Sequence, residues 1–198
     1  MILYTIHRIP FLRNWYFHAA GRSFMRRKLQ PFLQHMPAGS SVLDIGSGGG
    51  LATSVLREAG FQVTPMDIQD GAYDDSTRPV VYDGKTFPFS DRQFDFGLLL
   101  TVLHHIKDPD AVLSEAFRTC RTVLIVEDIY RNPAQQYLTY ATDWFVNLFY
   151  SPNPHTNRND AQWKETFQRF DKQLIAVTYK PLLGLYLQAW YVVGTQEV

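Results

Sequence analysis

The chain has 198 residues, and its 19 basic and 19 acidic side chains give a formal net charge of zero at pH 7. This balance excludes a global basic field that would attract nucleic acid, and the 45% hydrophobic and 19% charged content excludes a disordered chain. Cys120 has no second cysteine with which to form an internal disulfide or a metal cluster, and no run approaches the roughly 18 apolar residues of a membrane span. We therefore expect a globular cytoplasmic protein in which residues 1–198 form one domain, without a signal peptide at the start and without a metal site.

The N-terminal part, residues 1–38, is basic and aromatic, because no acidic residue precedes Asp44. Apolar side chains recur at nearly helical spacing over residues 11–36, and Gly21 and Pro31 interrupt them. We predict two helical pieces that break near Gln30.

The elements that follow alternate between strands and helices. A buried strand (42–45), a glycine cluster (46–50), a helix (51–59) closed by Gly60 and a strand (62–66) come first. The chain continues with strands at 80–82 and 94–100, a helix at 110–120, a strand at 122–126, helices at 133–149 and 161–170, and a final strand pair, 174–179 and 185–194. Apolar strands that alternate with helices indicate a mainly parallel sheet covered on both faces, and the last pair a hairpin at one edge.

The glycine-rich turn VLDIGSGGG is the most informative stretch. Glycine permits a positive φ and lets a ligand approach the main chain closely. The dinucleotide pattern G-x-G-x-x-G/A requires a small residue at position 51 or 53, where this chain has Leu51 and Thr53, and the Walker pattern is absent as well. A nicotinamide-dependent oxidoreductase is therefore a rival that the pattern disfavours.

This turn resembles the first motif of the class I S-adenosylmethionine-dependent methyltransferases, and the similarity extends over residues 41 to about 195. The resemblance implies a Rossmann-like three-layer α/β sandwich with a mainly parallel seven-stranded sheet and one antiparallel strand near the C-terminus. It implies S-adenosylmethionine as cofactor and S-adenosylhomocysteine as product. By this match Asp44 orders the loop and helps to position the amino acid part of the cofactor, and the loop residues Gly46, Ser47, Gly48 and Gly50 lie against it.

Later motifs of that family match in order. Asp67 in TPMDIQD corresponds to the ribose-binding carboxylate, and Ile68 would flank the adenine. Asp83 corresponds to the residue that accepts a hydrogen bond from the adenine amine, with Gly84 beside it. Taken singly, either aspartate is more often an ordinary turn residue, and it is their joint spacing that favours a cofactor site. The segment between them, GAYDDSTRP, is shorter and more polar than the helix usual there.

Candidates for proton transfer follow the next two strands. Thr101 comes directly after strand 94–100, at the edge where ligands bind in such folds, so it is assigned to the cofactor site. His104 and His105 follow, and the ordinary pKa of histidine, ~6.5, suits a general base. The alternative is that one of them only packs. Glu127 and Asp128 close strand 122–126, and since neighbouring residues of a strand point to opposite faces, only one should face the pocket; we favour Asp128. The predicted catalytic set is His105, His104 and Asp128.

The acceptor is the least determined part. The family builds its acceptor site from N-terminal helices and from an insertion, here residues 131–170, whose aromatic side chains either line a pocket or pack two helices. Residues 1–38 are interpreted as a lid over the cofactor, with a membrane-surface helix and a packing helix as alternatives. We expect methyl transfer to a small molecule, most simply to a hydroxyl oxygen. The rivals are a lipid or quinone acceptor at a membrane surface and a non-catalytic binding module.

Overall fold

The computed structural model describes Trp15, residues 21–132, Gln135, Tyr137 and residues 156–182 and 186–195. Its helices are α3 (Gly21–Leu33), α4 (Leu51–Glu58), α5 (Pro109–Thr119) and α7 (Asp160–Arg169), with short 3-10 turns η2 (Asp75–Thr77) and η3 (Leu103–His105). Its strands are β1 (Ser41–Ile45), β2 (Gln62–Asp67), β3 (Val80–Val81), β4 (Phe94–Leu100), β5 (Cys120–Ile129), β6 (Gln173–Leu182) and β7 (Tyr186–Gly194).

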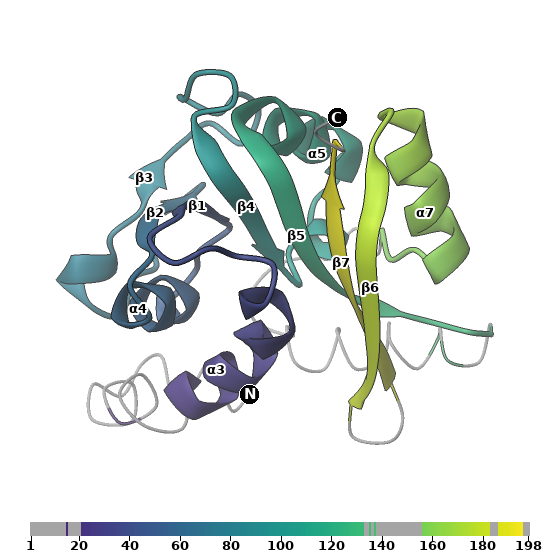
Figure 1. Ribbon diagram of the computed structural model, residues 1–198, viewed down its shortest axis with the longest axis horizontal. Coiled ribbons are helices and arrows are strands. Elements are labelled where there is room, and N and C mark those ends of the chain that lie inside the picture. Colours follow the sequence, from purple (N-terminus) through teal and green to yellow (C-terminus); the bar gives the residue numbers. More distant parts are fainter. Residues whose placement is uncertain are drawn as a thin grey trace.

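The seven strands form one sheet in the order β3-β2-β1-β4-β5-β7-β6 (Figure 1). Neighbouring strands from β3 to β5 are parallel, and β7 is antiparallel to both β5 and β6. The predicted fold class is therefore confirmed, including the single reversed strand and the hairpin at the edge. The order reverses at β1 and β4, which makes the carboxyl ends of these two strands a topological switch point.

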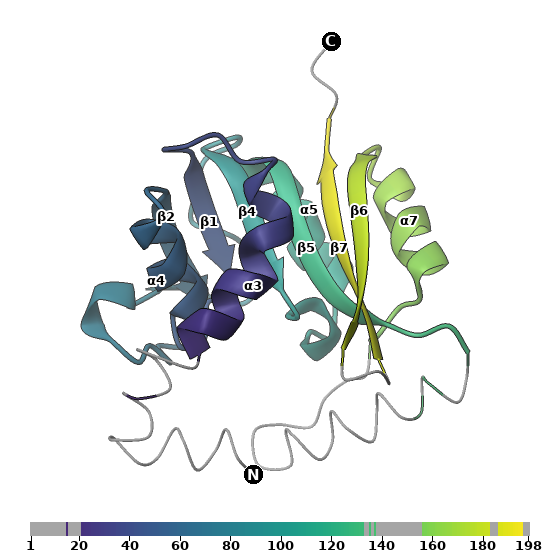
Figure 2. The same cartoon turned by 60° about the horizontal axis from the view of Figure 1, so that its bottom comes forward.

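Helices cover both faces of the sheet (Figure 2), and a hydrophobic core lies on each face. One contains Leu113 of α5 and Trp163 of α7, and the other contains Leu29 of α3 and Leu56 of α4, all of them buried. Strands that are covered on both faces contain consecutive apolar residues. Both β4 and β5 contain such a run. Cys120 is buried in the first of these cores, and burial raises its pKa to about 12.

Several predicted boundaries are wrong, two of them at elements that concern the candidate site. The expected break near Gln30 is absent, since α3 continues through Pro31 and ends at Leu33. Pro31 lies in the last turn of the helix, where the packing of Leu29 and Phe32 at the core holds the helix in place. Strand β5 extends to Ile129 because it pairs with β7 along that length, so Glu127 and Asp128 lie within the strand.

Some predictions fall outside the described residues. These are the helical piece before Gly21, apart from Trp15, and the helix at 133–149, apart from Gln135 and Tyr137. Among the helices that the structure describes, none has the length and apolar character to cross a membrane.

Candidate functional site

Three predicted carboxylates lie on adjacent strands. Asp44 is in β1, Asp67 ends β2, and Asp83 follows β3 by two residues. Because these strands are parallel neighbours, their carboxyl ends meet at one edge of the sheet. The structure thus brings together the residues that the sequence assigned to the cofactor.

The glycine loop between β1 and α4 requires glycine for different reasons at different positions. Gly46, Gly48 and Gly50 all have positive φ, at 72°, 51° and 81°. A Cβ on Gly46 would lie 2.8 Å from Val102, and one on Gly50 would lie 2.2 Å from Thr77, whereas nothing lies within 4 Å of a Cβ on Gly48. Gly46 and Gly50 therefore accommodate protein side chains, and the exposed Gly48 borders open space.

Asp44 is buried below this loop. Its Oδ2 accepts a hydrogen bond from Thr53 Oγ1 at 2.6 Å, which ties β1 to the first turn of α4. Burial raises the pKa of Asp44 to about 6, and the hydrogen bonds from Thr53 oppose that shift. The contact joins the strand and the helix on either side of the glycine loop.

Asp67 connects β2 to the glycine loop. Its Oδ2 accepts from the Gly48 amide at 2.9 Å and its Oδ1 from the Ile68 amide at 2.7 Å. Ile68 is 61% exposed, and a Cβ on Gly84 would lie 3.5 Å from Ile68 Cγ2. An exposed aliphatic side chain, a glycine and a carboxylate thus share one small surface at the end of β2.

Asp83 lies beside that surface, exposed, in a tight turn. Its Oδ1 accepts from the amides of Lys85 and Thr86, and these bonds hold the pKa of Asp83 below its ordinary value. The turn also positions an anionic oxygen at the end of β3.

The segment after β2 contacts the glycine loop, which the sequence did not predict. Tyr73 donates its amide to the Gly49 carbonyl, and a Cβ on Gly49 would lie 2.7 Å from the Tyr73 ring. Thr77 fills the space beside Gly50 in the same way. A short polar segment replaces the usual helix here, as the sequence suggested, and it packs directly on the glycine loop. The GGG run was a signal that something approaches closely.

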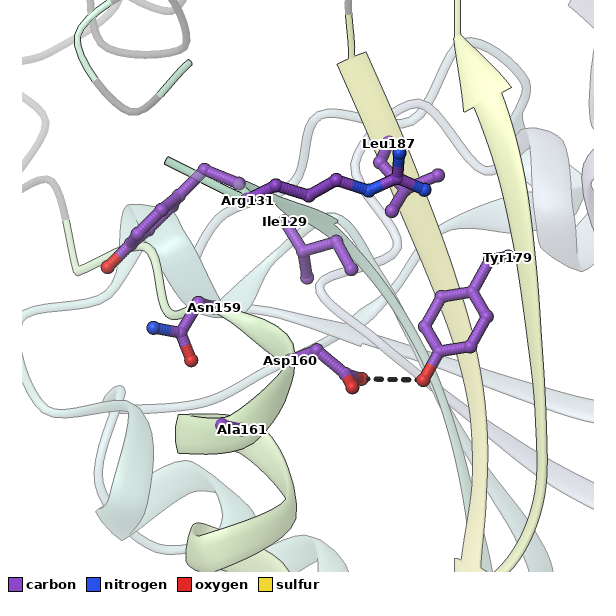
Figure 3. Close-up of a pocket in the computed structure, with 8 residues that line it drawn as sticks. Ile129, Arg131, Asn159, Asp160, Ala161, Tyr179 and Leu187 are labelled. Carbon is purple, nitrogen blue, oxygen red and sulfur yellow. Dashed lines mark hydrogen bonds between the residues drawn. The ribbon is translucent and has the colours of Figure 1, made fainter. Parts of the chain in front are cut away.

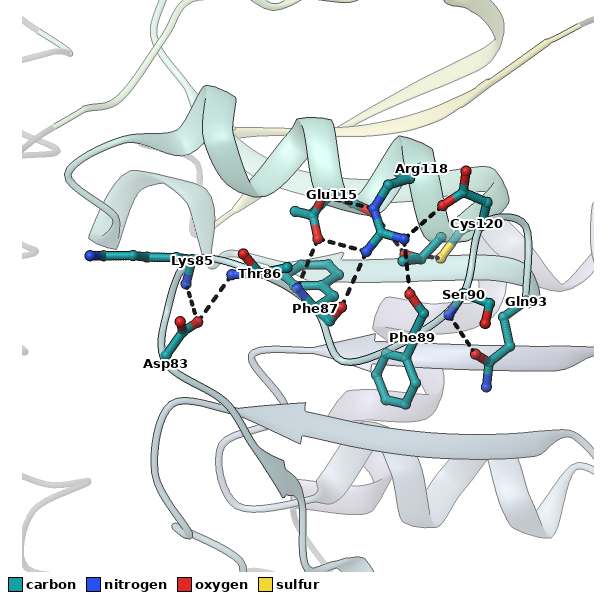
Figure 4. Close-up of polar contacts among 12 residues, drawn as sticks. Asp83, Lys85, Thr86, Phe87, Phe89, Ser90, Gln93, Glu115, Arg118 and Cys120 are labelled. Carbon is teal, nitrogen blue, oxygen red and sulfur yellow. Dashed lines mark hydrogen bonds and ion pairs between the residues drawn. The ribbon is translucent and has the colours of Figure 1, made fainter.

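The run FPFSDRQFD is held by one arginine (Figure 4). Arg118 on α5 donates to the carbonyls of Phe87 and Phe89 and to the carboxylates of Glu115 and Asp91. Glu115 in turn accepts from the Phe87 amide. Arg118 and Glu115 therefore hold the connection between β3 and β4 against α5.

Thr101, at the end of β4, has the left-handed φ of 56°, which is unusual for a β-branched residue. Its amide donates to the Val126 carbonyl and its hydroxyl to the Leu100 carbonyl. The same hydroxyl accepts from Lys28 Nζ of α3 at 3.0 Å. Lys28 was not among the predicted site residues, since only the fold brings positions 28 and 101 together.

Glu127 and Asp128 face opposite sides of the sheet, as expected. Buried Glu127 accepts from the amides of Val102 and Leu103 through Oε1 and pairs with His104 Nδ1 through Oε2 at 2.6 Å. Half-buried Asp128 accepts from Gln188 Nε2 at 2.7 Å. Among the predicted catalytic residues, His104 is thus buried on Glu127, and His105 is exposed on η3 with its ring centroid 4.0 Å from that of His104.

A cavity of about 500 Å³ opens at the end of β5 (Figure 3). Arg131 and Asp160 line it together with Tyr179, whose hydroxyl donates to Asp160 at 2.8 Å. Its walls come from β5, β6, β7 and the start of α7, so it borders the first residue, Arg131, and residues 159–161 of the insertion that the sequence assigned to the acceptor.

Residues 16–176 match the family model described as a methyltransferase domain. This match covers most of the chain, and the chain therefore belongs to the class I S-adenosylmethionine-dependent methyltransferases. It is an S-adenosylmethionine-dependent methyltransferase, as the resemblance of its motifs implied.

Relatives agree with this assignment by name, and solved structures share the fold. The chain is similar to the ubiquinone biosynthesis O-methyltransferases of Psychrobacter cryohalolentis, 28% identical over 65% of this chain and 56% of that protein, and Stutzerimonas stutzeri, 24% identical over 75% and 72%. The fold resembles magnesium protoporphyrin IX methyltransferase from Synechocystis with bound S-adenosylhomocysteine (TM-score 0.65, 15% identity, 88% of this chain and 84% of that one). It also resembles a protein from Pyrococcus horikoshii (TM-score 0.71, 15% identity, 91% and 93%).

Proposed function

We propose that this enzyme binds S-adenosylmethionine across the ends of β1, β2 and β3 and transfers its methyl group to a hydroxyl oxygen of a small acceptor. The observation that carries the proposal is Asp67, a carboxylate at the end of β2 beside the open Gly48 and the exposed Ile68. A carboxylate next to a glycine that leaves space suits a sugar diol placed against the main chain.

The remaining residues fit the other parts of the cofactor. Ile68 and Gly84 offer an apolar surface for the adenine, and Asp83 offers an acceptor for its amine. Ser47 Oγ is buried without a hydrogen-bond partner among the described residues, and a buried hydroxyl of this kind calls for a ligand contact. Gly46, Gly50 and Thr101 would shape the amino acid end of the site.

The sulfonium supplies an electrophilic methyl group, so the protein must align the acceptor and remove the hydroxyl proton. His105 is our candidate to accept that proton, because it is exposed on η3, the turn that follows β4. His104 and Glu127 would have a positioning role, because their buried pair holds η3, and with it His105, in place. Asp128 would contact the acceptor on the other face of the sheet.

One observation favours an oxygen acceptor of small size: the two relatives named above are O-methyltransferases by name. Their names also keep a quinone or lipid acceptor at a membrane surface as the second candidate. Sedimentation with liposomes, compared between the full chain and a chain lacking residues 1–20, tests it.

Isothermal titration with S-adenosylhomocysteine tests the cofactor site. We expect Gly48→Trp and Asp67→Ala to lose binding, because one fills the open space and the other removes the carboxylate. Gly39→Trp is the matched control, since Gly39 also has a positive φ and nothing within 4 Å of a Cβ but lies before β1. NAD in place of the nucleoside is expected to give no heat of binding.

If Gly39→Trp abolishes binding as strongly as Gly48→Trp, or if NAD binds, the site is misplaced.

Once the cofactor site is established, a screen for transfer of labelled methyl groups to hydroxylated small molecules identifies the acceptor. With that acceptor, His105→Gln is expected to lower kcat by about 10²- to 10⁴-fold, the range for loss of a general base. An unchanged kcat would remove His105 from the mechanism.

A further inference from the structure

The carboxyl edge of the sheet is divided into two parts with different chemistry. On β1, β2 and β3 it carries three aspartates, Asp44, Asp67 and Asp83. On β4, β5 and β7 it carries Thr101, Asp128 and Gln188, and Lys28 of α3 reaches this second part. The proposed cofactor site occupies the first part and reaches the second only at Thr101, which leaves Lys28, Asp128 and Gln188 for another group.

Lys28 is held in this place by the packing of its helix. The indole Nε1 of Trp190 on β7 donates to the Lys28 carbonyl at 2.8 Å, and the neighbouring Leu29 is buried in the core. The side chain therefore extends from a fixed backbone position toward the end of β4, where Nζ lies 3.0 Å from Thr101 Oγ1.

The surroundings of Lys28 leave its charge poorly compensated. Burial lowers the pKa of its ammonium, and the carboxylates of Asp128 and Glu127, the ionisable groups that act on it from β5, oppose that effect only in part. Within the part of the chain that the structure describes, a single neutral hydroxyl is its hydrogen-bond partner, so two of its three donors have no protein partner there. Desolvating a cation without satisfying its donors is costly, and an apolar side chain would serve packing better.

Asp128 offers a complementary group nearby. Its Oδ1 is occupied by Gln188, which fixes the carboxylate, and its Oδ2 has no hydrogen-bond partner among the described residues. The cluster therefore presents donors and an acceptor that have no protein partner among the described residues. Such a pair suits a ligand that has an anionic oxygen and a hydroxyl.

From this geometry we propose that Lys28, supported by Thr101 and Asp128, binds an anionic oxygen of the methyl acceptor, so that the acceptor is an acidic hydroxyl compound such as a phenol or an enol. The inference rests on the proposed function and adds the class of acceptor and a residue that selects it. The cofactor is a second source of an anionic oxygen for Lys28, because its amino acid end carries a carboxylate.

The test uses 4-nitrophenol as the probe, because its phenolate absorbs visible light and its phenol does not. The probe is titrated into the full-length protein saturated with S-adenosylhomocysteine. Lys28→Met keeps the length of the side chain and removes its charge, and the matched control is Arg27→Met, which removes an exposed cation from the next position of α3. Thermal unfolding of each variant verifies that it is folded.

We expect saturable binding of the phenolate to the wild type, weaker by about ten- to hundredfold in Lys28→Met, as for loss of a hydrogen bond to a charged group. Arg27→Met should match the wild type, and all three proteins should bind S-adenosylhomocysteine alike. In the wild type the bound probe should ionise at lower pH than the free probe, and this shift should vanish in Lys28→Met.

Two results would overturn the inference. One is selective loss of S-adenosylhomocysteine binding in Lys28→Met, which would assign Lys28 to the carboxylate of the cofactor. The other is equal or absent binding of the phenolate in the wild type and Lys28→Met. Failure of the wild type itself to bind S-adenosylhomocysteine is a separate outcome, because it refutes the proposed function first.

Discussion

Asp44 illustrates how a single buried residue serves the loop at a cost to stability. Only 2% of its surface is exposed, and its carboxylate relies on Thr53 for hydrogen bonding. Burial of the charge outweighs that bond, so the pKa of Asp44 rises from 3.8 to about 6. The folded state therefore binds a proton more tightly than the unfolded state.

This shift predicts a pH dependence of stability. A raised carboxyl pKa stabilises the fold below the unfolded value of 3.8, and that contribution is lost as pH rises through the folded value of about 6. The free energy of unfolding should therefore fall by about 3 kcal/mol between these values on account of this group. Urea denaturation at successive pH values should show the fall in the wild type and not in Asp44→Asn, whose amide oxygen still accepts from Thr53.

Asp171→Asn is the control for that experiment. Asp171 is exposed and has a positive φ of 53°, a conformation that asparagine also adopts. Its replacement should leave the pH dependence between these values in place. If Asp44→Asn keeps the same slope, another group is responsible for it.

A second prediction concerns glycine in the loop. Gly50→Ala combines the strain of a positive φ with a Cβ 2.2 Å from Thr77 Oγ1, whereas Gly39→Ala has the strain alone. Gly39→Ala should cost about 1–2 kcal/mol and Gly50→Ala a further 1–3 kcal/mol or so for overpacking. Chemical denaturation measures the free energy of unfolding of both variants. Equal losses of stability would mean that Thr77 moves away from the loop without cost.

At the scale of elements, Glu127 joins β5 to the turn after β4. It satisfies two backbone amides and His104 at once, and it is completely buried. Glu127→Ala should therefore cost about 3–5 kcal/mol, because it leaves buried groups unpaired. Asp128→Ala, one residue further and on the opposite face, should cost less.

Hydrogen exchange identifies the element that is released. In Glu127→Ala the amides of Val102 and Leu103 should exchange faster, while those of β1 keep their protection. Uniform acceleration over the whole sheet would indicate global destabilisation and would refute the local role of Glu127.

Sequence reasoning succeeded where the signal is local. Hydrophobic runs and glycines located β1, β2 and β4, and parallel strands necessarily place Asp44, Asp67 and Asp83 at one edge. It failed where a distant partner decides the outcome. Pairing with β7 lengthens β5, packing at the core carries α3 through Pro31, and neither partner is visible in the local pattern.

The same distinction holds for the candidate site. The residues beside the glycine cluster follow from motif spacing, whereas Lys28 reaches Thr101 across 73 positions of sequence. Thr77 and Tyr73 likewise contact the glycine loop from a segment with no periodic pattern. The proposed acceptor group could therefore be found only from the fold.

For the molecule as a whole, the division of the sheet edge predicts that cofactor and acceptor groups can be separated by mutation. A ligand that binds only the folded state stabilises it by mass action, by about 2.7 kcal/mol at a concentration one hundred times Kd. For a chain of this size that corresponds to a rise in Tm of roughly 5–10 °C. S-adenosylhomocysteine should produce this rise in the wild type and in Lys28→Met, and should not produce it in Asp67→Ala. Loss of the rise in Lys28→Met would mean that the two parts of the edge act as one site, whereas its persistence in Asp67→Ala would place the cofactor away from the end of β2.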